Sequence, residues 1–247
     1  MKFTVYGINP VVEALRGACK DVESVLVSAD REDRAVKEII LLSRSKGIEV
    51  KRLSADELTR ISGNASHQGV AAFLKGAYPY RDIEDAIKIW KDSGETAFFL
   101  VLDSIHDPQN MGSLIRSALA AGVHAVIVPR DRSCPVTAAV VKASAGAAMH
   151  AAIARVTNLR EAIKRLKEEG VWATAVELGS EQTIYASDLK GDIAIVIGSE
   201  GEGIRRLVRE ECDFRAHIPM RGAVNSLNAA QAGAVALFEA RRQKDGA

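Results

Sequence analysis

Apolar and polar positions follow two different periods along this chain of 247 residues. Short apolar runs rich in β-branched residues indicate strands, and longer segments with apolar residues three or four positions apart indicate helices. Near the amino terminus, Asn9 followed by a proline is typical of a helix start, and Ser54 with Glu57 forms a capping box. These patterns predict a small α/β domain over residues 1–75, with strands at 22–28, 48–53 and 70–74 and helices at 9–15, at 32–46 and after Ser54.

The rest of the chain repeats the alternation on a larger scale. Residues 76–96 combine structure-breaking loop residues with one predicted helix at 82–90, and we interpret them as a linker. Apolar strands separated by helices then predict an α/β domain over 97–247, whose mostly parallel sheet is covered on both faces. The predicted strands are 98–103, 123–129, 149–156, 171–177, 192–197 and 214–218, and the predicted helices are 112–121, 136–145, 158–169, 204–211 and 229–243.

Composition places the chain among globular proteins. A hydrophobic content of 47% is ample for a core, and 26% charged residues are usual for a soluble protein. The net charge of +1 carries no electrostatic signature of nucleic-acid binding, so any RNA surface must be local. Cys19, Cys134 and Cys212 lack disulfide or zinc-ligand spacing, so we expect free thiols in a reducing cytoplasm. No apolar run approaches a membrane span, and no metal site is indicated.

A glycine-rich segment, Gly198-Ser-Glu-Gly-Glu-Gly203, follows the strongly apolar strand predicted at 192–197. Glycines there allow either a tight turn or a close approach of the backbone to a ligand. The segment is not a dinucleotide-binding fingerprint, because that pattern needs glycines at its first, third and sixth positions. Glu200 or Arg206 stands where one of those glycines should be. Taken alone, the segment is also typical of a simple turn.

Segment 107–116, Asp-Pro-Gln-Asn-Met-Gly-Ser-Leu-Ile-Arg, follows another predicted strand. Asn110 is well placed to cap the next helix, which is its structural interpretation. Arg116 lies in an otherwise apolar part of that helix, where it is either a solvated side chain or a group that grips phosphate or carboxylate through two hydrogen bonds. Because open α/β sheets bind ligands at the carboxyl ends of their strands, we favour a function for Arg116.

A third segment follows the strand predicted at 214–218. Its residues 218–228 show neither a helical nor a strand period and are Ile-Pro-Met-Arg-Gly-Ala-Val-Asn-Ser-Leu-Asn. Ser226 or Asn228 is a suitable cap for the following helix, but a cap explains one polar side chain and the stretch has several. Met220 and Leu227 are suited to lining an apolar slot. Three strand ends therefore carry glycine-rich or polar segments that a parallel sheet brings to one edge.

Together the three segments resemble the motifs of the SpoU family of S-adenosyl-L-methionine (AdoMet)-dependent RNA ribose 2′-O-methyltransferases. The first 75 residues resemble the ribosomal-protein-L30-like RNA-binding domain of one branch of that family, through Tyr-Gly-Ile-Asn-Pro-Val at 6–11 and His-Gln-Gly-Val at 67–70. The sequence departs from many members just past the third motif, at Ala229 and Ala230, which should alter packing more than chemistry. The residues that match the three motifs in order are Asn110, Gly112, Arg116, Gly198, Glu200, Gly201, Gly203, Ile218, Pro219, Met220, Gly222, Ser226, Leu227 and Asn228.

The resemblance implies a SPOUT fold, which is a Rossmann-like, mostly parallel sheet with a C-terminal trefoil knot. It also implies a homodimer that binds AdoMet through the backbone of the knotted loops. The cofactor-binding residues that it implies are Gly198, Gly201, Ile218, Met220 and Leu227.

The resemblance also implies how the 2′-OH is activated. This hydroxyl is a poor nucleophile, so the site must help to remove its proton and align it with the sulfonium methyl group. Arg116 is always protonated, so we interpret it as gripping the RNA phosphate and stabilising the forming alkoxide. The residues expected to orient substrate and arginine are Asn110, Glu200, Ser226 and Asn228.

The substrate that the resemblance implies is a guanosine of 23S rRNA, because the two-domain branch modifies large-subunit rRNA. Transfer RNA is the alternative substrate, and neither DNA nor a membrane is indicated as a partner. A non-catalytic RNA-binding protein of the same fold would lack AdoMet binding. A nucleotide-dependent oxidoreductase is disfavoured by the glycine spacing.

Overall fold

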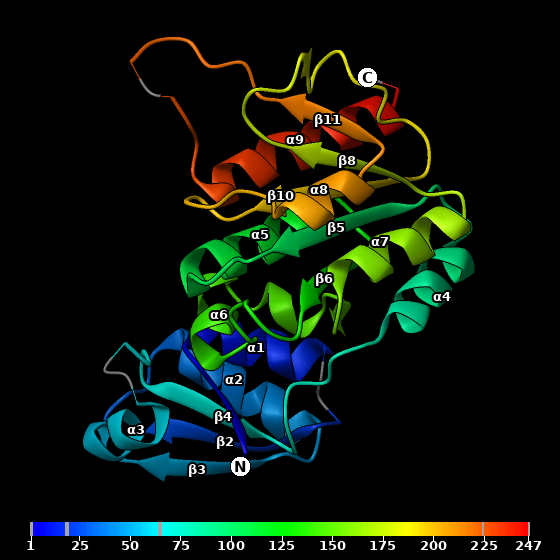
Figure 1. Ribbon diagram of the computed structural model, residues 1–247. Coiled ribbons are helices and arrows are strands. Elements are labelled where there is room, and N and C mark those ends of the chain that lie inside the picture. The colour runs from blue at the N-terminus through cyan, green and yellow to red at the C-terminus, as the bar shows by residue number, and fades with distance from the viewer. Residues whose placement is uncertain (1, 18–19, 64–65, 224, 247) are drawn as a thin grey trace. The chain divides into compact units, whose positions relative to one another are not determined.

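The computed structural model of the chain describes residues 2–17, 20–63, 66–223 and 225–246 (Figure 1). The chain forms two compact units. The first contains the residues up to Pro79 together with Val136–His150, and the second contains Tyr80–Pro135 and the residues from Ala151 onward. Segment Val136–His150 therefore belongs to the first unit, although in the sequence it lies between two strands of the second. No described helix is long and apolar enough to cross a membrane.

The first unit has a four-stranded mixed sheet with the strand order β1-β4-β2-β3. β2 and β3 are parallel, whereas β4 is antiparallel to both of its neighbours. The strands are β1 (Phe3–Tyr6), β2 (Val22–Ser28), β3 (Glu49–Leu53) and β4 (Val70–Leu74), and the helices are α1 (Ile8–Gly17), α2 (Arg34–Ser45), α3 (Ala55–Ser62), α6 (Ala138–Ala143) and the 3₁₀ helix η1 (Ala147–Met149).

Two helix starts of this unit test the sequence interpretation. The capping box predicted before α3 is present, because the side chains of Ser54 and Glu57 each accept a hydrogen bond from the other residue's backbone N–H. The predicted cap at Asn9 is wrong, because α1 already begins at Ile8 and Asn9 lies inside its first turn. Strand β1 was not predicted.

The two segments that resemble the RNA-binding domain meet each other in the first unit. The Gly7 amide donates to the Val70 carbonyl at 3.1 Å, and the Ile8 amide donates to Oε1 of Gln68 at 3.1 Å. His67 is buried, and its Nδ1 accepts a hydrogen bond from the Gly69 amide at 2.9 Å. These residues therefore shape the turn before β4 and hold the start of α1 against it.

The second unit has a seven-stranded sheet with the order β7-β6-β5-β10-β8-β11-β9, in which every neighbouring pair is parallel. The mostly parallel α/β sheet predicted from the sequence is confirmed. The trefoil knot stays a prediction. The strands are β5 (Phe98–Asp103), β6 (Ala125–Pro129), β7 (Ile153–Val156), β8 (Trp172–Val176), β9 (Gln182–Thr183), β10 (Ile193–Gly198) and β11 (Phe214–His217). The short β9 was not predicted.

Helices cover both faces of this sheet (Figure 1). On one face, α4 (Ile83–Ser93), α7 (Leu159–Glu168) and α8 (Arg206–Glu211) share a core with the inward side chains of the strands. On the other, α5 (Pro108–Ala120) packs against α9 (Ala229–Lys244). A Cβ atom at Gly233 would lie 2.3 Å from Cδ2 of Leu114, so the glycine allows these two helices to approach closely.

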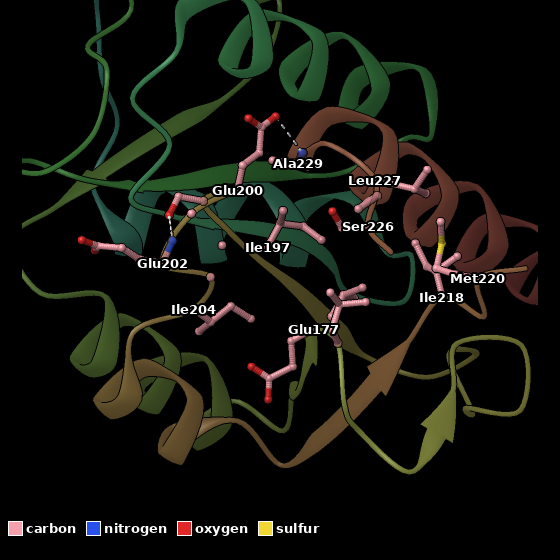
Figure 2. A pocket seen from close by; sticks show the side chains of 17 residues that line it. Glu177, Ile197, Glu200, Glu202, Ile204, Ile218, Met220, Ser226, Leu227 and Ala229 are labelled. Atoms are coloured by element: carbon pink, nitrogen blue, oxygen red, sulfur yellow. Dashed lines mark hydrogen bonds between the residues drawn. The ribbon is translucent and has the colours of Figure 1, made fainter. Parts of the chain in front are cut away.

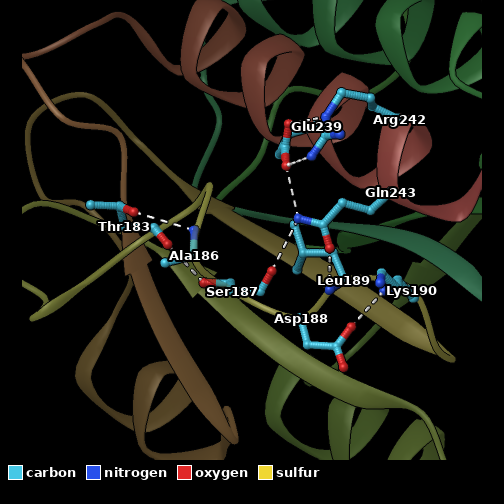
Figure 3. Close-up of polar contacts among 9 residues, drawn as sticks. All are labelled: Thr183, Ala186, Ser187, Asp188, Leu189, Lys190, Glu239, Arg242 and Gln243. Atoms are coloured by element: carbon cyan, nitrogen blue, oxygen red, sulfur yellow. Dashed lines mark hydrogen bonds and ion pairs between the residues drawn. The ribbon is translucent and has the colours of Figure 1, made fainter. Parts of the chain in front are cut away.

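The last turn of α9 is fastened to the segment between β9 and β10 (Figure 3). The buried Gln243 accepts from the Leu189 amide at 2.9 Å and donates to the Ser187 carbonyl at 3.0 Å. Its amide also donates to Oε1 of Glu239 at 2.8 Å, and Arg242 donates two hydrogen bonds to that carboxylate. One amide side chain thus satisfies three buried polar groups and fixes this segment to the helix.

Candidate active site

A cavity of about 310 Å³ lies at the carboxyl edge of the second unit's sheet (Figure 2). Its walls come from three loops, which follow β8, β10 and β11, and from the start of α9. The lining residues are Val176, Glu177, Leu178, Ile197, Gly198, Ser199, Glu200, Gly201, Glu202, Gly203, Ile204, Ile218, Met220, Ser226, Leu227, Ala229 and Ala232. The five residues that the sequence nominated for cofactor binding all belong to this lining.

The loop after β10 closes on itself. The Ser199 amide donates to the Gly203 carbonyl at 3.2 Å, and the Gly203 amide donates back to the Ser199 carbonyl at 3.0 Å. A Cβ atom at Gly198 would lie only 2.2 Å from the carbonyl carbon of Gly203. By contrast, a Cβ atom at Gly201 would meet nothing within 4 Å. Gly198 is therefore required by the packing of the loop itself, whereas Gly201 faces open space.

Glu200 links the first motif segment to the start of α9, which directly follows the third motif segment. Its Oε1 accepts a hydrogen bond from Nδ2 of Asn110 at 2.9 Å. The Ala229 amide donates to the same oxygen at 3.4 Å, as Figure 2 shows. α5 begins at Pro108, and its cap is Asp107, whose carboxylate accepts from the Asn110 amide at 3.0 Å. The capping interpretation of Asn110 is therefore wrong. Because Asp107 caps the helix, the Asn110 side chain is available to bind Glu200.

The other nominated catalytic residues differ in their positions. Ser226 lines the cavity. Asn228 is the cap of α9, and its Oδ1 accepts a hydrogen bond from the Gln231 amide at 2.7 Å. Of the two caps suggested by the sequence, Ser226 and Asn228, the second is therefore confirmed.

Arg116 is exposed on α5 and is not among the lining residues. It lies six positions beyond Asn110, which is about 9 Å along a helix axis. Within the part of the chain that the structure describes, its guanidinium makes no hydrogen bond or ion pair.

The sequence analysis missed the β8 side of the cavity, where Val176, Glu177 and Leu178 contribute. Glu177 is paired with Arg209 of α8, with 2.9 Å between Oε2 and Nε, although the angle is too poor for a hydrogen bond. The available signal was its position at the end of an apolar predicted strand. With Glu177, the charged lining residues are three glutamates, and no described lining residue is basic. Such a lining favours a ligand that carries positive charge.

The chain belongs to the SpoU rRNA methylase family, which matches residues 97–238, as its three motifs predicted. Residues 4–80 match a second family, described as RNA 2′-O ribose methyltransferase substrate binding. Among its relatives, the chain is 41% identical to the 23S rRNA (guanosine-2′-O-)-methyltransferase RlmB of Xylella fastidiosa (strain 9a5c), over 97% of this chain and 96% of that protein.

Two solved structures share the fold. The SpoU methyltransferase AviRb from Streptomyces viridochromogenes, in complex with the cofactor AdoMet, matches with a TM-score of 0.83 and 24% identity, over 100% of this chain and 92% of that chain. The AdoMet-bound rRNA methyltransferase from Sinorhizobium meliloti matches with a TM-score of 0.79 and 25% identity, over 98% of this chain and 87% of that chain.

Proposed function

We propose that this chain transfers the methyl group of AdoMet to the ribose 2′-OH of a guanosine in 23S rRNA. The observation that carries the proposal is that two motif segments line one cavity and the remaining one is joined to its wall by Glu200, which accepts from Asn110 and from the Ala229 amide. The Xylella fastidiosa relative, which aligns along nearly the whole chain, bears this activity in its name.

The cavity suits AdoMet in size and chemistry. Its volume of about 310 Å³ falls in the usual range of small-molecule sites. Ile197, Ile204, Ile218 and Leu227 offer apolar contact for the adenine and the methionine chain, and the loop backbone offers hydrogen-bonding groups. Bound AdoMet supplies a methyl group activated by a positively charged sulfur, and the acidic lining complements that charge. The Sinorhizobium meliloti structure, which shares this fold, contains AdoMet.

The RNA side of the site is assigned to α5. The Arg116 guanidinium is exposed and unengaged among the described residues, so it is available to hold a phosphate with two parallel hydrogen bonds. A guanidinium at the phosphate also stabilises negative charge that develops on the neighbouring 2′-oxygen. Asn110 and Glu200 orient the substrate, and Ser226 and Asn228 complete the polar edge. The first unit, whose family is described as substrate binding, contacts RNA outside the site.

We further propose a cytoplasmic homodimer. Leu119 on α5 and Phe238 on α9 are exposed apolar side chains on two helices that pack together. A second copy of the chain would remove them from water. Size-exclusion chromatography with light scattering tests this, and a mass near 26.5 kDa at micromolar concentration would contradict it.

The substrate is tested by incubating the protein with AdoMet carrying a radiolabelled methyl group and with 23S rRNA or tRNA. Label in 23S rRNA, together with loss of one ribose methylation in a deletion strain, supports the proposal. Label in tRNA with silent rRNA assigns the alternative substrate. Absence of AdoMet binding by calorimetry points to a non-catalytic RNA-binding protein.

Arg116→Ala tests the RNA side. We expect kcat to fall on the order of 10²- to 10³-fold, because a group that stabilises developing charge is lost. AdoMet affinity should stay nearly unchanged, since Arg116 does not line the cavity. Arg116→Lys should rescue only partly, because lysine lacks the two-point geometry. The control is Arg215→Ala, which changes another exposed arginine, in β11. Near-normal turnover of Arg116→Ala would remove this residue from the mechanism.

A further inference from the structure

A buried carboxylate stands at the end of β5, outside the cavity lining. Asp103 is 0% exposed, and its oxygens accept hydrogen bonds from the Arg205 amide at 2.9 Å, from Nε of Arg205 at 2.7 Å and from the Ser104 hydroxyl at 3.1 Å. Arg205 directly follows the loop that forms the middle of the cavity wall. Since a buried charge is costly unless it is paired, Asp103 strongly favours this one position of Arg205.

Asp103 lies next to both ends of the loop between Gly198 and Arg205. In the register of β5 and β10, Asp103 is the partner of Gly198, the residue at which the loop leaves the sheet. The loop then returns through Ile204, which is 1% exposed and lines the cavity, to Arg205. The loop therefore departs beside Asp103 and ends bound to it.

The segment from Asp103 to Asn110 also holds the loop at Glu200. Ser104 has a φ of 62°, a left-handed conformation that is uncommon for residues other than glycine, and it turns the chain toward α5. The first turn of α5 then presents Asn110, which donates to Glu200 in the loop. The carboxylate of Asp103 and the amide of Asn110 thus fasten one loop at two points.

We infer that Asp103 and Arg205 are positioning residues for AdoMet binding and methyl transfer. Neither residue lines the cavity, and they act by holding the loop in the shape that places Glu200 and the backbone of Gly198 and Gly201. The inference rests on the proposed function of the cavity. A purely structural pair would lower the stability of the fold without changing the affinity or rate of the molecules that remain folded.

The test compares Asp103→Asn, Arg205→Lys and Arg206→Ala in the full-length protein. Asp103→Asn keeps the size of the side chain and removes the charge, whereas Arg205→Lys keeps the charge and removes the Nε geometry. Arg206 is the matched control, because it is the next residue and its ion pair with Glu210 is exposed, with 74% of the Arg206 side chain accessible. Calorimetry gives the AdoMet Kd, and methyl transfer at saturating AdoMet gives kcat and the KM for RNA. Thermal unfolding reports stability separately.

We expect Asp103→Asn to raise the AdoMet Kd about tenfold and to lower kcat by 10- to 100-fold, because small misplacements of a reacting site cost rates of that order. Arg205→Lys should show the same pattern with smaller changes, and Arg206→Ala should match the wild type. If Asp103→Asn does not fold, Arg205→Lys decides. Folded variants with wild-type Kd and kcat, whatever their melting temperature, would overturn the inference. A wild-type protein that binds no AdoMet would instead overturn the proposed function.

Discussion

Gly198→Ala perturbs the loop at its tightest point. The added Cβ atom would lie 2.2 Å from the Gly203 carbonyl carbon, 2.3 Å from its oxygen and 2.4 Å from the Ile204 nitrogen, whereas an ordinary contact begins near 3.4 Å. All three are backbone atoms, so no side chain can rotate away. The backbone of Gly203 and Ile204 must therefore move away from residue 198 by roughly 1 Å.

The cost of that movement follows from what holds the loop. Overpacking of a well-packed site costs about 1–3 kcal/mol. If the loop opens instead, it loses the two hydrogen bonds between Ser199 and Gly203, which contribute about 1 kcal/mol each. Both routes give about 2 kcal/mol. For a chain of this size, that free energy corresponds to a fall in Tm of roughly 4–8 °C.

Thermal unfolding of the protein without ligand measures this effect, and Gly201→Ala is the matched control in the same loop. A Cβ atom at Gly201 meets nothing within 4 Å, and its φ is not left-handed. Its Tm should therefore stay at the wild-type value or rise slightly, because alanine restricts the unfolded chain. If Gly201→Ala weakens AdoMet binding without lowering Tm, the alanine methyl group occupies ligand space. An unchanged Tm for Gly198→Ala would refute the packing argument.

Two further predictions concern groups away from the cavity. Gln243→Leu should destabilise the fold by about 1–3 kcal/mol, because the Leu189 amide and the Ser187 carbonyl lose their partner, and a wild-type Tm would contradict this. Burial raises the pKa of Cys212 to about 12, and burial also raises the pKa of Cys134, so both thiols should alkylate slowly near pH 8 and Cys212 the more slowly. The pKa of Cys212 is higher in the folded state than in the unfolded state, so the protonated thiol favours folding. This contribution to the free energy of unfolding is present below the usual thiol pKa and is lost as the pH rises toward 12. Peptide mapping after iodoacetamide treatment checks the order, and equal labelling of the two in the folded protein would contradict it.

Much of the fold was predictable because turn and cap residues in the sequence mark where its helices and strands begin and end. Strands β2, β4 and β5 have the predicted limits, since each is an apolar run between clear turn or cap residues. The start of α5 was misplaced, although Asp107 followed by Pro108 is a strong cap and first-turn pair. β9 is two residues long and has no pattern to detect.

The site residues that belong to a local sequence motif could be predicted. Those whose role depends on a partner far away in the sequence could not. The residues nominated for cofactor binding lie in segments that follow strand ends, and a parallel sheet brings these segments to one edge. Glu177 and Asp103 are also acidic residues at strand ends, but no local pattern tells which of them lines a cavity and which is buried. Their roles depend on Arg209 and Arg205, which lie 32 and 102 positions further along the chain.

Asn110 shows why a local explanation of a polar residue does not exclude a functional one. An asparagine near a helix start is sufficiently explained as a cap, and only the resemblance to the SpoU motifs nominated Asn110 for the chemistry. Asp107 caps α5 instead, so the amide of Asn110 points across to the loop and binds Glu200. This hydrogen bond joins the helix that carries Arg116 to the wall of the cavity. A change at Asn110 should therefore disturb both the RNA side and the AdoMet side, whereas a change at Arg116 should disturb the RNA side alone.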